Sequence, residues 1–293
     1  MKKKIKISNI IIPILLIAVA ACCVVPFLTI IFTSLESQES VIEYGYSFFP
    51  RDPTLDSYRY VLSNSKQLFD SYALTIFVTV VGTVISMVCM TLCAYALSRN
   101  DFKLKGIISF FIYFTMLFSG GIVSSYIWIA RYLRLSNTVW ALIFPSMMSA
   151  YNIFILRVAC KSIPYSLVEC AKLEGANELY IFIRIIIPLA KTGIATIALL
   201  VMFQYWNDWY LSMMYMDMSE RSSLQYYLVK ILNNVNFAKQ HASASGGLAQ
   251  SIDVPDQGVR MAICALAAGP MLLAFPFFQK YFVKGITVGS VKG

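Results

Sequence analysis

The sequence predicts an all-α membrane protein that crosses a lipid bilayer about six times and keeps both termini in the cytoplasm. Hydrophobic residues make up 58% of its 293 residues and charged residues only 13%, and its mean hydropathy is +0.68. Soluble domains carry roughly 25% charged residues, so this composition fits a bilayer better than water. Six apolar windows are long enough to cross a hydrocarbon core of about 30 Å, and each must be a helix because lipid offers unpaired backbone groups no partner. The windows lie at about 8–33, 71–98, 107–130, 138–158, 193–214 and 260–282.

The distribution of charge predicts how these helices are oriented. Fifteen of the 24 Lys and Arg residues, but only four of the 15 Asp and Glu residues, fall in alternate connections or at the helix ends beside them. Short cytoplasmic connections hold the excess of basic residues. The segments placed in the cytoplasm are therefore 1–7, 99–106, 159–192 and 283–293. The net charge of +9 reports this topology and gives no support for nucleic-acid binding.

The first window follows four lysines within residues 1–7, so a cleavable signal peptide is an alternative interpretation. Its apolar run is longer than that of a typical signal peptide, and Thr33–Glu36 lack a small-x-small cleavage pattern. We therefore expect a retained helix. All seven cysteines fall in predicted helices or on the cytoplasmic side, so no disulfide framework is expected. Cys89 and Cys93 lie one helical turn apart but have no His or acidic neighbours, which favours packing over metal binding.

The remaining windows leave two long extracytoplasmic loops, 34–70 and 215–258, within a single transmembrane domain that spans 1–293. The first loop predicts a short helix at about 55–64, and the second contains lone His241 and a small, polar run. The stretch 107–135 allows two interpretations. Its helix ends near Gly120 and a separate segment follows at the outer surface, or the glycines at 120 and 121 let one helix pack closely against a neighbour.

The cytoplasmic segment 159–192 predicts two short helices at an angle. Ser162 is placed to cap the first helix, and Pro164 fits its first turn. Gly175 is expected to end that helix in the left-handed conformation. Asn177 can cap the second helix, and Pro188 is expected to break the run before the chain re-enters the membrane. An amphipathic loop lying in the membrane interface is the alternative interpretation of the same pattern.

The residues of this segment resemble a known motif. Glu169-Cys170-Ala171, Glu174-Gly175-Ala176, Phe182, Ile185 and Ile187-Pro188 are similar to the cytoplasmic EAA loop of binding-protein-dependent ABC importers, which reads E-A-A-x-x-D-G-A, then Phe and I-x-L-P. The sequence departs at Cys170, where Ala is usual, and at Glu174, where Asp is usual, while the spacing of Gly and Pro is intact. The resemblance implies that a coupling loop contacts an ATPase through Glu169, Ala171, Glu174, Gly175, Ala176 and Pro188.

Further segments extend the resemblance over nearly the whole chain. They are similar to the second permease of carbohydrate-uptake systems of the maltose-importer class, and most of all to the branch for complex polysaccharides or oligosaccharides. These segments are Phe118–Gly121, Asn137–Leu142, Tyr205–Trp209, Phe278–Gly285 and Val291–Gly293. The resemblance implies a type I ABC importer permease fold in the bacterial cytoplasmic membrane. It also suggests that the basic, Gly-rich tail 284–293 reaches toward the ATPases, whereas its composition alone indicates a frayed end.

The family also implies which partners complete the system. They are a second, homologous permease that forms a heterodimer with this chain, two cytoplasmic ATPase subunits, and an extracytoplasmic sugar-binding protein. The sequence itself contains no P-loop, G-x-x-x-x-G-K-[ST], to cradle phosphates, and its single histidine cannot build a metal cluster alone. We expect that this chain is not an enzyme and holds no metal or cofactor, so that ATP is bound by the partner subunits.

The fifth window contains the candidate substrate path. Gln204, Asn207 and Asp208 recur at helical spacing and form a polar stripe if one helix runs through the window. At about 1.5 Å per residue, Asp208 then lies some two-thirds of the way to the outer face, where an ionisable group usually faces a bundle interior or a wet cavity. Trp206 and Trp209 are suited to stack on sugar rings, and an outer aromatic belt is an equally good interpretation.

Three alternatives to sugar import follow from the same sequence. An importer of this class could instead carry peptides or polyamines. A secondary transporter predicts inverted repeats with ion-coordinating broken helices, and the sequence has no convincing internal repeat. A membrane enzyme would need a catalytic set, and no Ser/His/Asp arrangement is evident.

Overall fold

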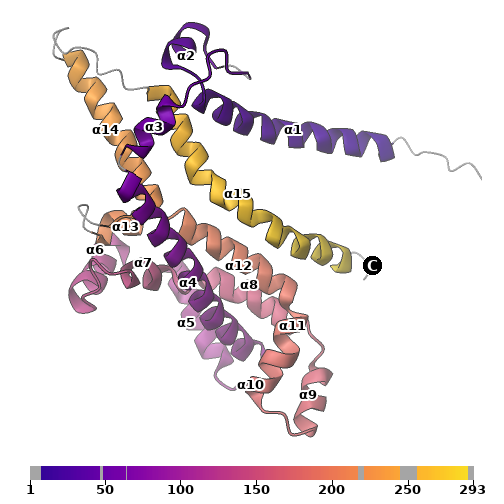
Figure 1. Ribbon diagram of the computed structural model, residues 1–293. Coiled ribbons are helices and arrows are strands. Elements are labelled where there is room, and N and C mark those ends of the chain that lie inside the picture. The colour runs from indigo at the N-terminus through magenta and orange to yellow at the C-terminus, as the bar shows by residue number, and fades with distance from the viewer. Residues whose placement is uncertain (1–7, 47–48, 64, 217–220, 245–255, 290–293) are drawn as a thin grey trace, which may run out of the picture. The chain divides into compact units, whose positions relative to one another are not determined.

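The computed structural model describes residues 8–46, 49–63, 65–216, 221–244 and 256–289 (Figure 1). Within these ranges every regular element is a helix, and strand-like pairing is limited to one isolated bridge between Glu36 and Pro53. The predicted all-α class is thus confirmed. The chain separates into two compact units, Met1–Leu68 with Leu228–Pro270 and Phe69–Tyr227 with Met271–Gly293.

The first unit contains the N-terminal helix and the polar connection that follows it. α1 (Ser8–Ser34) is long and apolar enough to span a membrane, and the side chains of residues 11–26 are exposed, as expected of a helix that faces lipid. α2 (Gln38–Tyr44) and α3 (Asp56–Leu62) follow, and α3 confirms the short helix predicted there. Buried Glu36 holds the connection together because it accepts hydrogen bonds from the Ser40 hydroxyl at 2.7 Å and the Arg51 amide at 3.4 Å.

Two long helices lie in the C-terminal part of the chain. α14 (Leu224–Ala244) occupies much of the connection 215–258, which the hydropathy windows leave as a loop because Lys and Asn residues interrupt its apolar positions. α15 (Asp256–Gly289) begins four residues before the predicted window and includes a candidate span, Gln257–Phe277. The basic residues 1–7, the second half of the small, polar run (245–247) and the last residues of the tail (290–293) lie outside the described residues, as does the side chain of His241.

The second unit is built around four helices: α4 (Ser65–Ser98), α5 (Lys105–Leu117), α8 (Ala150–Lys161) and α12 (Lys191–Trp206). Their facing side chains form one core, in which Met90, Leu156 and Ile197 are fully enclosed. Tyr205 ties this core together. Its hydroxyl lies 2.8 Å from the Ser86 hydroxyl on α4 and donates to the Ile143 carbonyl at 3.0 Å.

Three of the candidate spans are bent rather than straight. The chain bends by 116° between α5 and the helical stretch that follows it, which consists of α6 (Gly121–Ile127) and η1 (Trp128–Tyr132). α7 (Trp140–Ile143) and η2 (Phe144–Ser146) meet α8 at 58°, and the helical run Glu178–Leu189 meets α12 at 83°. With α1, α4 and α15, these pairs make up to six spans, in agreement with the predicted number. The 116° bend decides the question left open for 107–135, which forms two segments.

The fifth predicted window is not one helix. α12 ends at Trp206, a short turn follows, and α13 (Tyr210–Tyr215) starts a new helix. Asp208 lies in this turn, and its carboxylate accepts a hydrogen bond from the Leu211 amide at 3.3 Å. A short acidic side chain at this place stabilises the start of a helix because it pairs with an amide that has no partner within the helix.

Candidate functional site: the coupling segment and a serine-lined cavity

The segment 159–192, here named the coupling segment, folds into two short helices. α9 (Tyr165–Leu173) is followed by α10 (Glu178–Ile181), which continues through η3 (Phe182–Ile186) into α11 (Ile187–Leu189). Gly175 ends α9 with φ of +82°, and the Asn177 side chain caps α10 by accepting from the Tyr180 amide at 2.7 Å. Both features were predicted.

At the ends of this segment, the prediction for Ser162 is wrong and the break predicted at Pro188 is found one residue later. Ser162 does not cap α9, because α8 extends to Lys161 and the Ser162 hydroxyl donates to the Ala159 carbonyl at 2.8 Å. Pro188 lies in α11, the last stretch of the helical run, and the run ends one residue after it, at Leu189, close to the predicted break. The 83° bend lies beyond it, at Ala190 between α11 and α12.

The inner face of the coupling segment packs against the end of α4. Val168, Ala171, Ile181 and Phe182 are buried in one cluster with Tyr95 of α4. The rings of Phe182 and Tyr95 lie 5.3 Å apart. The segment is therefore a folded part of the second unit rather than a loose connection.

Charged side chains add a second set of contacts at the same place. One Arg99 amino group lies 3.1 Å from Asp101 and 3.2 Å from Glu178, and the Lys172 ammonium lies 2.8 Å and 2.9 Å from the same two carboxylates. The Tyr95 hydroxyl donates to the other Glu178 oxygen at 2.6 Å. These five residues, named the Arg99 network, join α4 and the short connection after it to both helices of the coupling segment.

Burial explains why the Arg99 network is needed. The Arg99 side chain is only 7% exposed, and a buried guanidinium is costly unless carboxylates neutralise it. The hydrogen bond from Lys172 lowers the pKa of the Asp101 carboxyl to about 2, and the same bond raises the pKa of the Lys172 ammonium. Both groups therefore stay ionised at any physiological pH.

The outer face of the coupling segment is exposed. Leu173 is 89% exposed, although it is apolar, and Glu169 and Glu174 beside it are also exposed. Of the other residues predicted to contact an ATPase, Gly175 and Pro188 are exposed, Ala171 is buried and Ala176 is half-buried. The end of α9 therefore presents an exposed leucine between two acids.

The predicted path residues lie around the end of α12, where they do not form one stripe. Gln204 and Asn207 are exposed, and Asp208 in the turn is half-buried. The Asn207 side chain turns back to donate to the Phe203 carbonyl at 3.0 Å. Of the two tryptophans, Trp206 is 3% exposed and belongs to the interior, whereas Trp209 is 43% exposed.

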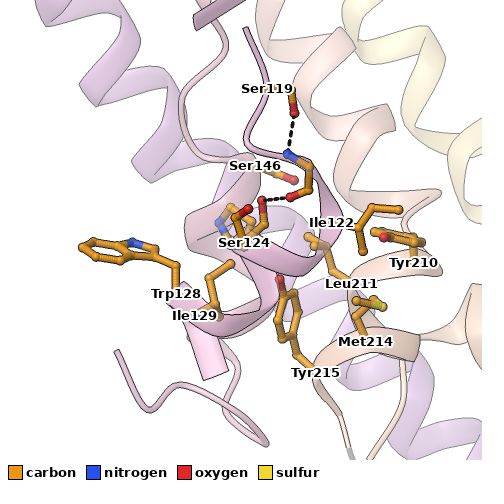
Figure 2. A pocket seen from close by; sticks show the side chains of 13 residues that line it. Ser119, Ile122, Ser124, Trp128, Ile129, Ser146, Tyr210, Leu211, Met214 and Tyr215 are labelled. Atoms are coloured by element: carbon orange, nitrogen blue, oxygen red, sulfur yellow. Dashed lines mark hydrogen bonds between the residues drawn. The ribbon is translucent and has the colours of Figure 1, made fainter. Parts of the chain in front are cut away.

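A cavity of about 680 Å³ lies directly beside this turn. Figure 2 shows its lining, which comes from α6, η1, η2 and α13. Four serines contribute hydroxyls, Trp128 and two tyrosines contribute rings, and none of the lining residues is charged. In Figure 1 these elements lie at one end of the second unit and α9 and α10 at the other.

Neither the Arg99 network nor the cavity was predicted from the sequence. In the sequence, Arg99 and Lys172 indicate only topology, because pairing between residues 79 positions apart, as in Arg99 and Glu178, depends on the fold. A local signal did exist, since Tyr95 and Arg99 lie one helical turn apart at the end of an apolar helix. The cavity serines give no comparable signal, because isolated serines in apolar segments are common packing residues.

Comparison with known proteins gives a consistent result. Residues 91–288 match the family described as "Binding-protein-dependent transport system inner membrane component". The chain is 37% identical to the polygalacturonan/rhamnogalacturonan transport system permease protein YtcP of Bacillus subtilis, over 95% of this chain and 96% of that protein. It is 35% identical to Protein LplC of the same organism, over 94% and 91% of the two chains.

A solved structure agrees with these relatives. A chain from the crystal structure of a bacterial ABC transporter that imports the acidic polysaccharide alginate matches with a TM-score of 0.79 and 32% identity, and the match covers 96% of this chain and 99% of that one. The likeness confirms the ABC importer permease fold. This multi-pass membrane chain belongs to the family of binding-protein-dependent transport system inner membrane components, whose members are permease subunits of transporters and not enzymes.

Proposed function

We propose that this chain is one of two permease subunits of an ABC importer that carries a sugar or oligosaccharide across the bacterial cytoplasmic membrane. The observation that carries the proposal is similarity over nearly the whole chain to permeases named for polygalacturonan/rhamnogalacturonan and for oligosaccharides. Besides YtcP, these include the galactooligosaccharide permease GanQ of Bacillus subtilis, 29% identical over 96% of this chain. No comparable relative points to peptides or polyamines among those named here, and a carbohydrate is therefore the favoured cargo.

The proposed assembly follows from the family. A permease of an ABC importer works with a partner permease, ATPase subunits and a binding protein. We assign this chain to a heterodimer with a homologous permease, served by two cytoplasmic ATPases that bind the ATP and by an extracytoplasmic sugar-binding protein. In that arrangement both termini and the coupling segment 159–192 are cytoplasmic, and the loops 34–70 and 215–258 face outward.

Energy reaches the chain through the coupling segment in this proposal. The exposed face of α9 with Leu173, Glu169 and Glu174 supplies an apolar anchor and two charges for a cleft on the ATPase. Because the inner face is packed against α4 and held by the Arg99 network, movement of the ATPase moves α4 as well. Closure of the ATPases would then rock the two permeases and open the path alternately to each side.

The substrate path is assigned to the region around the end of α12. Gln204, Asn207, Asp208 and Trp209 are at least partly accessible there, so they can meet a solute. Trp206 is enclosed in the core and supports this region from behind. Asn207 and Asp208 each already have a backbone partner, so the assignment rests on the accessibility of this region to a solute.

The cargo is tested by the ATPase activity of the complete complex in nanodiscs. The complex is incubated with its binding protein and with tetragalacturonate, arabinotetraose, a tetrapeptide or spermidine. We expect stimulation of ATP hydrolysis by at least one carbohydrate and by neither the peptide nor the polyamine. Stimulation by the peptide or the polyamine alone would replace the proposed cargo with that solute.

The coupling role is tested by reversing one charge on α9. Glu169→Lys should leave insertion and assembly intact but separate ATP hydrolysis from uptake, because the acid lies on the exposed face and contributes nothing to the core. Lys103→Glu, also an exposed charge reversal but outside the coupling segment, is the matched control. Wild-type uptake per ATP in Glu169→Lys would remove this residue from the coupling surface.

A further inference from the structure

We propose that the cavity lined by α6, η1, η2 and α13 is a subsite that holds part of the oligosaccharide during transport. The inference rests on the proposed function, since it names the place on this chain where the glycan is held. It adds residues that lie outside the predicted path, notably Trp128 and Ser146, and it is supported by three independent features of the cavity.

The first feature is the position of the cavity at breaks in three helices. The lining residues Ser119 and Gly121 flank the break after α5, Ser146 precedes the break before α8, and Tyr210 follows the break after α12. Within a membrane, non-helical backbone is tolerated only where protein buries it or where it lines a water-filled cavity. Secondary transporters place substrate sites at discontinuous helices because the free backbone groups can bind solutes, and the breaks beside this cavity offer the same chemistry.

Gly121 illustrates how the backbone is shaped for this purpose. It begins α6 with φ of +80°, and no other atom lies within 4 Å of the place where a Cβ would stand. The left-handed conformation turns the chain sharply at the edge of the cavity, which an L side chain would resist. The Ser119 hydroxyl accepts from the Gly121 amide at 3.3 Å, and Figure 2 shows this contact at one edge of the lining.

The second feature is the hydrogen-bonding capacity of the serines. Ser124 donates to the Gly120 carbonyl and Ser125 to the Gly121 carbonyl, the latter at 2.9 Å. Both hydroxyl protons are thus already used in hydrogen bonds to the backbone, and the hydroxyl oxygens can still accept hydrogen bonds from a ligand. Ser119 accepts from a backbone amide and keeps its proton as a donor. The cavity therefore offers both donors and acceptors, the combination that matches sugar hydroxyls, each of which can donate one hydrogen bond and accept others.

The third feature is a set of aromatic rings without any charge. Trp128 is 59% exposed at the edge of the cavity, while Tyr215 of α13 is a buried part of the lining whose ring stacks on Tyr126 at 5.7 Å (Figure 2). Exposed aromatic surface can cover the C–H face of a sugar ring, and polar groups at its rim fix the orientation. A volume of about 680 Å³ falls in the range of roughly 300–1,000 Å³ typical of small-molecule sites. The uncharged lining predicts recognition of ring faces and hydroxyls, whether or not the glycan carries carboxylates.

The decisive variant is Trp128→Ala, with Trp140→Ala as its matched control. Both tryptophans are exposed, and each packs on an aromatic ring four residues later, Tyr132 or Phe144. Only Trp128 lines the cavity. In proteoliposomes with the complete complex and its binding protein, Trp128→Ala should raise the KM for uptake of tetragalacturonate or arabinotetraose, whichever the wild type transports, by roughly fivefold or more. Trp140→Ala should change it less than twofold.

Chemical protection gives a second readout that does not depend on transport rate. In a cysteine-free background, Ser146→Cys should react with a small methanethiosulfonate reagent, and the transported tetrasaccharide should slow that reaction. Ser136→Cys, exposed but outside the lining, should react equally with and without the sugar. Slowed labelling at 146 alone is the result that supports the subsite.

The contrary outcomes separate the two proposals. If the wild-type complex transports neither tetrasaccharide nor any other carbohydrate, the proposed function fails and the subsite fails with it. If the wild type transports a carbohydrate but Trp128→Ala keeps the wild-type KM and position 146 is not protected, only the subsite is wrong. If Trp128→Ala loses the second permease on purification, the cavity is a contact between permeases, which also overturns the subsite.

Discussion

Gly175 is the residue at which the backbone of the coupling segment depends most on side-chain chemistry. Its φ is +82°, and no atom lies within 4 Å of the place of a Cβ, so conformation rather than space limits substitution. Gly175→Val should destabilise the segment by about 1–2 kcal/mol and weaken coupling. Gly175→Asn should cost less, because Asn adopts the left-handed region more readily. Uptake per ATP hydrolysed measures the effect, and equal losses in both variants would contradict this explanation.

The Arg99 network predicts coupled effects of two mild substitutions. Tyr95→Phe removes the hydrogen bond to Glu178, and Glu178→Gln removes the charge that faces Arg99 and Lys172. Each should lower stability by about 1 kcal/mol, since Glu178 keeps half its surface in water and exposed pairs contribute little. The double variant should lose less than the sum, because residues in one network are not independent. Thermal unfolding of the wild type, the two single variants and the double variant measures this difference. Strictly additive losses would show that the contact between Tyr95 and Glu178 does not stabilise the protein.

The low pKa of Asp101, about 2, sets the pH range of this contribution. The folded pKa lies below the unfolded value of about 3.9, so the stabilisation is complete above pH of about 4 and is lost as the pH falls toward 2. The difference in melting temperature between wild type and Asp101→Asn should therefore be the same at pH 7 and pH 5, and it should shrink between pH 5 and pH 3, where only the unfolded state takes up the proton. A difference that stays constant from pH 5 to pH 3 would mean that Asp101 has no such partner.

Among the helices, α4 packs so closely against α12 that no space remains for a side chain at Gly82. A Cβ at Gly82 would lie 2.8 Å from the ring of Tyr205, whose hydroxyl already bonds Ser86 and Ile143. Gly82→Ala should thus destabilise the bundle by about 1–3 kcal/mol, as overpacking does. Gly106→Ala is the control in α5, where nothing lies within 4 Å, and it should be neutral or stabilising because Ala favours helix. Thermal unfolding in detergent measures both, and equal behaviour would contradict the packing.

Hydropathy predicted the apolar helices but not where they break, and it left α14 as a loop. The windows located α1, α4 and α15 because twenty apolar residues in lipid have no alternative to a helix. The breaks after α5 and α12 depend on polar residues that satisfy local backbone groups. Ser119 with Gly121, and Asp208 with Leu211, are such pairs. An Asn-Asp pair inside an apolar window is a cap signal, and the stripe interpretation passed over it.

The candidate site was predictable to the extent that it is local in sequence. Gly175 and Asn177 behave as their residue types indicate, because a helix end is decided by a few neighbouring residues. The sequence could not show which of Trp206 and Trp209 is exposed. Both lie in one apolar stretch, and only the packing of the folded chain distinguishes them. The partners of Arg99 also depend on the fold, because α4 and α10 are distant in the sequence.

At the scale of the whole molecule, the second unit places its two candidate sites at opposite ends. The coupling segment lies at one end and the serine-lined cavity at the other (Figure 1). α4, α5, α8 and α12 run between them, and their shared core around Leu156 and Ile197 is closely packed. A packed bundle moves as a body rather than bending locally. A displacement of α9 can therefore be transmitted to the helix breaks that line the cavity.

The central claim is that this chain forms part of an ATP-driven path for carbohydrate. The most direct test is uptake of a radiolabelled oligosaccharide into proteoliposomes that contain this chain, its partner permease, the ATPases and the binding protein. Accumulation should require ATP on the ATPase side and binding protein on the other, and omitting either should abolish it. Accumulation driven by an ion gradient without ATP, or none for any carbohydrate despite full assembly, would contradict it.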